Sequence, residues 1–119
     1  MKQLKVIVSG GGTGGHIFPA IAIVKLLEKK VSNIDVLFVG AKEKMEMIKI
    51  PSEGYNIEGL WVSGLQRRIT TDNFSFPFKL ISSLLKARKI IKRFKPDIAI
   101  GTGGYASGPL LYMAAKLKV

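Results

Sequence analysis

The sequence predicts an α/β fold built on a parallel sheet. Short apolar runs rich in β-branched residues alternate with longer segments whose apolar residues recur at helical spacing. Two of the apolar runs end in glycine-rich turns, at residues 10–15 and 101–108. This regular alternation is typical of a parallel sheet that carries helices on both faces.

The composition limits the class of protein and its partners. The 119 residues suffice for one domain with one hydrophobic core. The chain has no cysteine, which excludes a disulfide framework and a cysteine-based zinc site. No apolar run approaches the roughly 20 residues that span a bilayer. The net charge of +11 favours an anionic partner: nucleic acid, a membrane surface or a phosphorylated substrate.

The first half of the chain contains three predicted strands and two predicted helices. Apolar runs that end at glycine or serine predict the strands, and helical spacing of apolar residues predicts the helices. Pro19 fits the first turn of the first helix, and Pro51 is expected to end the second. The predicted strands are 4–9, 35–39 and 56–62, and the predicted helices are 17–30 and 41–50.

The second half is predicted to contain one long helix, one strand and a final helix. Residues 63–75 have no clear periodicity and are expected to be irregular. A long helix over 76–94 follows, because one apolar stripe runs along it: Leu80, Leu84, Ala87, Ile91 and Phe94. After the break at Pro96 we expect a strand over 98–101 and a helix over 110–117.

Both glycine turns follow predicted strands, so both belong at the carboxyl edge of the sheet, where ligands bind in such folds. Glycine allows positive φ and close approach of a ligand, and the following helix directs free N–H groups into the turn. Such a turn can bind a phosphate or diphosphate. The alternative is a tight turn without a ligand, although fewer glycines would suffice for that.

The first turn formally matches a dinucleotide-binding fingerprint, with glycines at 10, 12 and 15. The acidic residue expected at the end of the second strand is not in place, because Gly40-Ala41-Lys42 stand there. No Gly-Lys-Ser/Thr closes the turn as in a P-loop. A nicotinamide dehydrogenase is therefore a minor alternative.

His16, the single histidine, stands where the first turn becomes helix. It is either a polar residue in the first helical turn or a general base facing a ligand, a role that suits an imidazole with a pKa near neutrality. The position alone leaves both open.

A basic run over 86–95 lies near several aromatic and aliphatic residues. Apolar side chains beside cations are typical of a protein that lies on an anionic membrane. The alternative is that the run is a solvated helix face and the aromatic residues belong to the core. We expect no nucleic acid, because no recognisable RNA- or DNA-binding motif is present.

Taken together, these features resemble the MurG family of bacterial N-acetylglucosaminyltransferases. The match covers essentially the whole chain in order, and the combination of both glycine turns is specific. It rests on Gly11-Gly12-Thr13-Gly14-Gly15-His16, Phe18-Pro19, Met45-Glu46, Ser63-Gly64-Leu65, Lys95-Pro96-Asp97 and Gly103-Gly104-Tyr105-Ala106-Ser107-Gly108-Pro109.

The resemblance implies that the chain is part of the Rossmann-like N-terminal domain of a two-domain GT-B glycosyltransferase. The family transfers N-acetylglucosamine from UDP-N-acetylglucosamine to undecaprenyl-diphospho-N-acetylmuramoyl-pentapeptide in peptidoglycan synthesis. A peripheral protein at the cytoplasmic face of the bacterial cell membrane is therefore expected, with no metal and no cofactor in the site.

The resemblance also implies roles for individual residues. His16 is the candidate catalytic base. The substrate-binding residues are expected in the two turns, with 13–15 against the donor and both turns around the acceptor diphosphate: Gly11, Gly12, Thr13, Gly14, Gly15, Gly103, Gly104, Tyr105, Ser107 and Gly108. The expected membrane contacts are Ile69, Phe74, Phe76 and Phe78.

The length departs from the family pattern, because the family's donor-binding second domain is not contained in residues 1–119. We expect an incomplete N-terminal acceptor- and membrane-binding domain that does not catalyse alone. Two alternatives stay open: an acceptor- and membrane-binding subunit of a naturally split sugar transferase, and a nucleotide-binding module of dehydrogenase type.

Overall fold

Strands and helices alternate along the chain, as the apolar periodicity predicts. The computed structural model describes residues 2–62 and 72–119, and the side chains of 2–62 and 77–119. The elements are β1 (Leu4–Gly10), α1 (Gly14–Lys30), β2 (Ile34–Ala41), α2 (Glu46–Ser52), β3 (Asn56–Leu60), α3 (Asp72–Phe94), β4 (Ile98–Gly103) and α4 (Ser107–Lys116).

The sheet has the order β3-β2-β1-β4, and all its neighbouring strands are parallel. The predicted α/β class is therefore confirmed. From β1 the chain first winds outward through β2 to β3 and then crosses back to place β4 on the other side of β1. Ligands of such sheets bind where the winding reverses, beyond the carboxyl ends of the two strands concerned. Here that point lies between β1 and β4.

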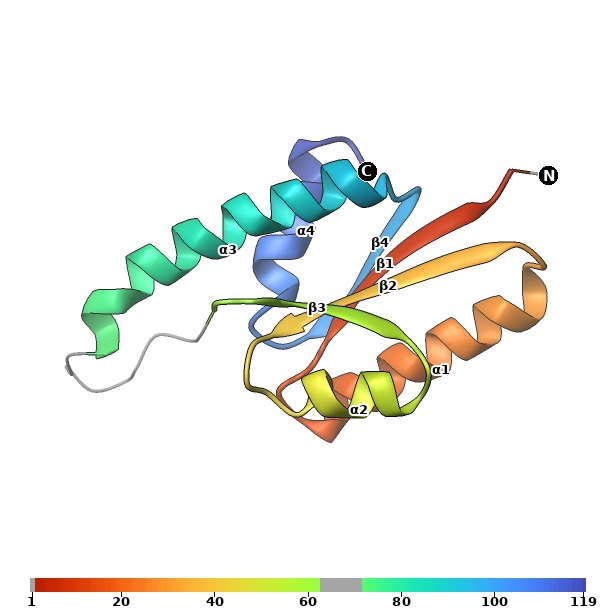
Figure 1. Cartoon of the computed structure of the whole chain (residues 1–119), viewed down its shortest axis with the longest axis horizontal. Coiled ribbons are helices and arrows are strands. Elements are labelled where there is room, and N and C mark those ends of the chain that lie inside the picture. The colour runs from red at the N-terminus through yellow and green to blue at the C-terminus, as the bar shows by residue number, and fades with distance from the viewer. Residues whose placement is uncertain (1, 63–71) are drawn as a thin grey trace.

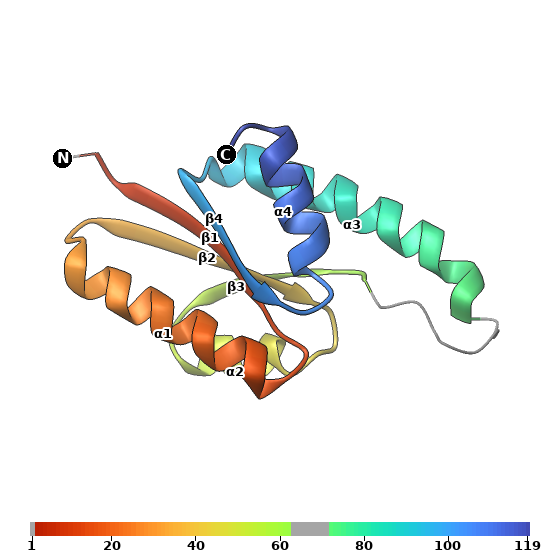
Figure 2. The ribbon, with the colours of Figure 1, turned by 180° about the vertical axis from the view of Figure 1, so that it is seen from behind.

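Helices cover both faces of the sheet: α1 and α2 lie on one face and α3 and α4 on the other (Figures 1 and 2). Side chains alternate between the faces along each strand, so β1 buries Val6 and Val8 against α1 and Ile7 against α3 and α4. The strands are buried on both sides, which is why they read as continuous apolar runs.

The long helix α3 packs on the sheet only through its C-terminal half. Ala87, Ile90 and Ile91 are buried in the core, whereas Leu80 keeps 36% of its surface exposed. The N-terminal half projects beyond the sheet in both views (Figures 1 and 2). The predicted apolar stripe therefore serves the core only over its second half.

Several predicted boundaries are wrong, and each has a local reason. The first helix begins at Gly14 because the extended Thr13 offers its carbonyl to the N–H groups of His16 and Ile17, so Pro19 lies inside the helix and not in its first turn. The second helix begins only at Glu46, since Ala41 still pairs with Leu60 in the sheet.

The remaining boundary errors concern strands and helices: β2 and β4 are longer than the predicted 35–39 and 98–101, and β3 is shorter than the predicted 56–62. Pro51 does not end α2, which continues to Ser52. The long helix begins at Asp72 and the last at Ser107, both earlier than predicted. Residues 63–71 of the predicted irregular segment lie outside the described residues.

Candidate functional site

The two glycine turns meet at the point where the sheet reverses its winding. The Gly11 N–H donates to the Gly103 carbonyl at 3.3 Å, which ties the turns together. Gly104 has φ +94°, and a Cβ there would lie 2.5 Å from the Gly11 carbonyl oxygen. The second turn therefore approaches the first so closely that only glycine fits at position 104.

A cleft of about 230 Å³ lies between the turns. It is lined by six residues predicted as site residues and by one further cation: Gly11, Gly12, Thr13, His16, Gly104, Tyr105 and Lys44. The Lys44 ammonium lies 5.6 Å from the centre of the Tyr105 ring, which keeps a positive charge at the rim of the cleft. The cleft therefore has the charge that an anionic ligand requires.

The N-terminus of α1 adds to this positive potential. Thr13 caps the helix with an extended backbone but makes no side-chain capping bond. The N–H groups of Gly14 and Gly15, in the first helical turn, have no acceptor within the helix. They lie at the positive end of the dipole of a 17-residue helix, as in known phosphate sites.

The imidazole of His16 is oriented by the first turn. Its Nδ1 lies 2.9 Å from the Gly11 carbonyl oxygen, which can only accept, so Nδ1 carries the hydrogen. The neutral ring therefore keeps its lone pair on Nε2. The ring packs on Gly103, where a Cβ would lie 2.7 Å from Nε2. The geometry is that of a histidine prepared to accept a proton at Nε2.

Hydroxyl groups brace the second turn from inside. Thr102 Oγ1 donates to the His16 carbonyl at 2.6 Å. Ser107 Oγ lies 2.7 Å from the Gly103 carbonyl oxygen and 3.1 Å from that of Ser9, and its side chain is buried. The hydroxyl of Ser107 thus serves the backbone, and its substrate contact stays a prediction.

Sequence reasoning assigned no role to Glu46 and Lys44. Glu46 is 2% exposed, and its two carboxylate oxygens accept the N–H groups of Gly12 and Ala41 at 2.9 and 3.0 Å. Met45-Glu46 was noted only as part of the family resemblance. The available signal was a short run of two acids and two lysines, Lys42 to Glu46, just beyond the carboxyl end of β2, the edge at which ligands bind in such sheets.

The dinucleotide alternative loses support at this edge. The buried acid beyond β2, Glu46, uses both carboxylate oxygens on backbone N–H groups, so this carboxylate is not available to a ribose as in a dinucleotide site. Over residues 2–62 and 72–119, no three side chains of His, Asp or Glu gather as a metal site requires.

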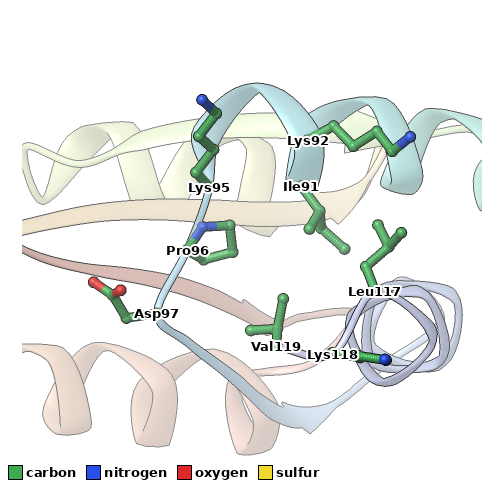
Figure 3. A pocket seen from close by; sticks show the side chains of 8 residues that line it. All are labelled: Ile91, Lys92, Lys95, Pro96, Asp97, Leu117, Lys118 and Val119. Atoms are coloured by element: carbon green, nitrogen blue, oxygen red, sulfur yellow. The ribbon is translucent and has the colours of Figure 1, made fainter.

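A larger cavity of about 510 Å³ lies at the opposite edge of the sheet (Figure 3). Ile91, Leu117 and Val119 point into it, whereas the amines of Lys92 and Lys95 point outward (Figure 3). The helices α3 and α4 end there, so the lysines stand at negative dipole ends. Helix C-termini carry unpaired carbonyl groups, whereas an anion site uses the free N–H groups of a helix N-terminus.

The predicted membrane residues are only partly described. Ile69 lies outside the described residues, and so do the side chains of Phe74 and Phe76. Phe78 is described and is 68% exposed on α3. Within the described part of the chain, no helix combines the length and apolar character needed to cross a bilayer.

Comparison with known proteins identifies the chain's relatives. It is 62% identical over 115 residues to a transferase of Christiangramia forsetii and 58% identical over 113 residues to one of Cytophaga hutchinsonii. Both are named UDP-N-acetylglucosamine--N-acetylmuramyl-(pentapeptide) pyrophosphoryl-undecaprenol N-acetylglucosamine transferase. The matches cover 96% and 95% of this chain but 31% of each relative, so the chain spans about a third of their length.

Solved structures agree. Acinetobacter baumannii MurG superimposes with a TM-score of 0.82 at 28% identity, over 98% of this chain and 33% of that one. The Streptomyces glycosyltransferase SsfS6 has a TM-score of 0.65 at 14% identity, over 98% of this chain and 38% of that one, and shares the fold. The family model described as the glycosyltransferase family 28 N-terminal domain matches residues 6–119. The chain therefore belongs to the family of glycosyltransferase family 28 N-terminal domains.

Proposed function

We propose that this chain is the acceptor-binding part of a transferase that moves N-acetylglucosamine from UDP-N-acetylglucosamine to undecaprenyl-diphospho-N-acetylmuramoyl-pentapeptide. The printed names of the relatives support this reaction. The chain spans about a third of their length, and we propose that residues 13–15 contribute only part of the donor contacts, the family's second domain supplying most of them. The proposed share of this chain is to hold the acceptor diphosphate and to supply the base.

One observation carries the proposal: a positively charged cleft and an oriented imidazole occur together between two glycine turns. Thr13 and Lys44 line the cleft, and α1 begins directly after Thr13 with the N–H groups of Gly14 and Gly15, so we place a diphosphate at this end of the helix. His16 lines the same cleft and its Nδ1 is bound to the Gly11 carbonyl, so we propose that Nε2 receives the proton of a hydroxyl on a sugar attached to that diphosphate.

In the proposed reaction the acceptor hydroxyl oxygen bonds to the anomeric carbon of the donor sugar. The bond from that carbon to the UDP oxygen breaks, and UDP leaves with the bonding electrons. Nε2 of His16 takes the hydroxyl proton as the new bond forms, and Nδ1–H stays on the Gly11 carbonyl. The amide N–H groups and Lys44 hold the diphosphate in place during the step.

Replacement of His16 tests the proposed base. In the full-length protein that carries this chain, His16→Ala should lower kcat by about 10² to 10⁴-fold, the usual contribution of a positioned base. Acceptor binding should change little, since the amide N–H groups remain. The measurement is transfer of labelled N-acetylglucosamine to a lipid-linked acceptor, with acceptor affinity determined separately.

Leu26→Ala is the control, because Leu26 is an exposed residue of the same helix that does not line the cleft. It should leave kcat unchanged. A His16→Ala enzyme that turns over at nearly the parental rate would show that His16 only packs in the first turn of α1.

We further propose that the projecting half of α3 places the protein on the cytoplasmic face of the cell membrane. Phe78, Ile81 and Leu85 share one side of the helix and are 68%, 56% and 60% exposed. An apolar groove of about 390 Å³ adjoins them between α3 and α4. The basic residues of α3 and the net charge of +11 add attraction to anionic lipid.

Vesicle sedimentation tests this surface. The parent should bind vesicles with anionic lipid more than neutral ones, and part of the binding should resist high salt because apolar side chains insert. Ile81→Ser plus Leu85→Ser should remove the salt-resistant part. The matched control is Leu26→Ser plus Ile48→Ser, which changes residues 54% and 79% exposed on the opposite face of the sheet. Equal effects of both pairs would contradict a specific membrane face.

A further inference from the structure

A hydrogen-bonded chain connects the buried carboxylate of Glu46 to the imidazole of His16. Glu46 Oε1 accepts the Gly12 N–H at 2.9 Å, and His16 Nδ1 donates to the Gly11 carbonyl at 2.9 Å. That N–H and that carbonyl are the two ends of a single peptide group, the one that joins Gly11 to Gly12. One amide therefore lies between the carboxylate and the ring.

The amide can transmit polarisation from one end to the other. Resonance in a peptide group moves electron density from nitrogen toward oxygen. An anion that accepts the N–H bond increases this shift, and bonds in a chain polarise one another. The Gly11 oxygen then becomes a stronger acceptor for Nδ1–H, which raises the proton affinity of Nε2 on the other side of the ring.

Glu46 is built into the fold so that its carboxylate reaches only backbone groups. It is 2% exposed, and its second oxygen accepts the Ala41 N–H at 3.0 Å. A Cβ at Gly11 would overlap the carboxyl group, and one at Gly40 would lie 2.5 Å from Cγ. Two glycines thus leave room for one buried acid, directly behind the turn that forms the wall of the cleft.

We infer that Glu46 is a positioning residue for His16, acting through the Gly11–Gly12 peptide. The carboxylate holds the turn so that the ring stays in its Nδ1–H form, and it stabilises the imidazolium that forms when Nε2 takes a proton. No proton moves along the chain of bonds, as none moves to the aspartate of a serine-protease triad. The inference deepens the proposed function, because it depends on His16 being the base.

The kinetic test uses Glu46→Gln in the full-length protein. Glutamine keeps the volume, but its NH₂ group faces one of the two N–H donors, and the negative charge is lost. We expect kcat to fall about 10- to 100-fold, the range for groups that orient a functional histidine, with little change in KM. The acid limb of the kcat/KM profile should move to lower pH, because the imidazolium loses its stabilising charge.

A spectroscopic test separates this inference from the proposed reaction. The ¹⁵N shifts of the His16 ring, assigned by their loss in His16→Ala, report its tautomer and its pKa without any turnover. In Glu46→Gln the pKa should fall and the share of the Nδ1–H tautomer should decrease. Glu53→Gln is the matched control, because it removes the same charge at the C-terminal end of α2, where the carboxylate pairs with Lys25 and Lys49 and not with the first turn. Its ring signals should stay those of the parent.

The outcomes distinguish the two ideas. An inactive Glu46→Gln whose ring signals match the parent overturns the inference and leaves the proposed function standing. Altered ring signals with a fully active His16→Ala support the chain of bonds and reject the base. If Glu46→Gln does not fold, a measurement on the parent tests the inference. The Gly12 amide signal should titrate with the His16 pKa, because both groups belong to one chain of hydrogen bonds. A Gly12 signal that does not move with pH overturns the inference. Besides His16, the titratable residues among the described lining of the cleft are the cation Lys44 and the phenol Tyr105, and both are unchanged in all of these variants.

Discussion

The two glycine turns look alike in the sequence and do different work in the structure. The turn after β1 lines the cleft with Gly11, Gly12, Thr13 and His16 and leads directly into the start of α1. The turn after β4 forms the opposite wall, and Gly103 and Gly104 have φ of +122° and +94° and are pressed against His16 and Gly11. In the proposed site the first turn contributes the groups that it exposes, and the second contributes the close approach of its backbone.

The turns also differ in what holds them. A buried carboxylate braces the first turn from α2, whereas hydroxyls of Thr102 and Ser107 brace the second from its own strand and helix. A glycine in such a turn therefore has two separate uses: it adopts positive φ, and it leaves space because it has no side chain. The structure assigns them position by position.

The largest effect is expected where both uses coincide. Gly104→Ala combines positive φ with a Cβ 2.5 Å from the Gly11 oxygen, and should lower the free energy of unfolding by about 2–5 kcal/mol from strain and overlap together. A Cβ at Gly108, in the first turn of α4, would meet no atom within 4 Å. Gly108→Ala should therefore raise the free energy of unfolding by up to about 1 kcal/mol. Urea unfolding measures both. Equal free energies of unfolding for the two variants would contradict the view that position 104 is crowded and position 108 is open.

A smaller effect is expected on binding through the first turn. Gly15→Ala adds a methyl group among the free N–H groups of α1, in ordinary contact with Thr13 Oγ1 at 3.5 Å. We expect about 5- to 10-fold weaker binding of a soluble sugar diphosphate, roughly 1 kcal/mol, without loss of stability. Calorimetric titration measures the affinity, and Gly108→Ala should reduce it less. If Gly108→Ala reduces it more, the second turn holds the diphosphate.

The smallest effect is expected at the other end of the β1–β4 pair, which keeps the turns in register. There Asp97 accepts the Lys5 N–H at 2.9 Å, and its own N–H donates to the Lys5 carbonyl at 2.7 Å. The bond from the Lys5 N–H, together with the positive charge of Lys2, lowers the pKa of Asp97. A lowered folded pKa stabilises the fold above the pKa of the unfolded chain, and this stabilisation is lost as the pH falls through the folded pKa.

Asp97→Asn should therefore be less stable than the parent at neutral pH and equally stable in acid, below the folded pKa of Asp97. Unfolding curves at several pH values measure the difference. A difference that stays constant with pH would assign the effect to packing and not to the charge. Unchanged diphosphate affinity in the same variant would show that the turns do not depend on this clamp.

The sequence by itself determined the order of strands and helices, the parallel sheet and the edge where ligands bind. These follow from the period of apolar residues and from the rule that parallel strands direct all their carboxyl ends to one side. It also singled out His16 and both turns, because glycine runs after strands are a local signal. The start of α1 at Gly14 escaped prediction, since it depends on the extended backbone of Thr13.

Only the tertiary structure decided which glycine allows close approach, which nitrogen of His16 bonds to the turn, and that Glu46 lies behind the first turn. Gly104 meets Gly11 across 93 positions of sequence, and Glu46 reaches Gly12 across 34. Contacts of that range arise when β4 and α2 are brought beside β1, and no local pattern encodes them. The chemistry was predictable where it depended on residue type and period, and unpredictable where it depended on which backbone groups the packed sheet sets face to face.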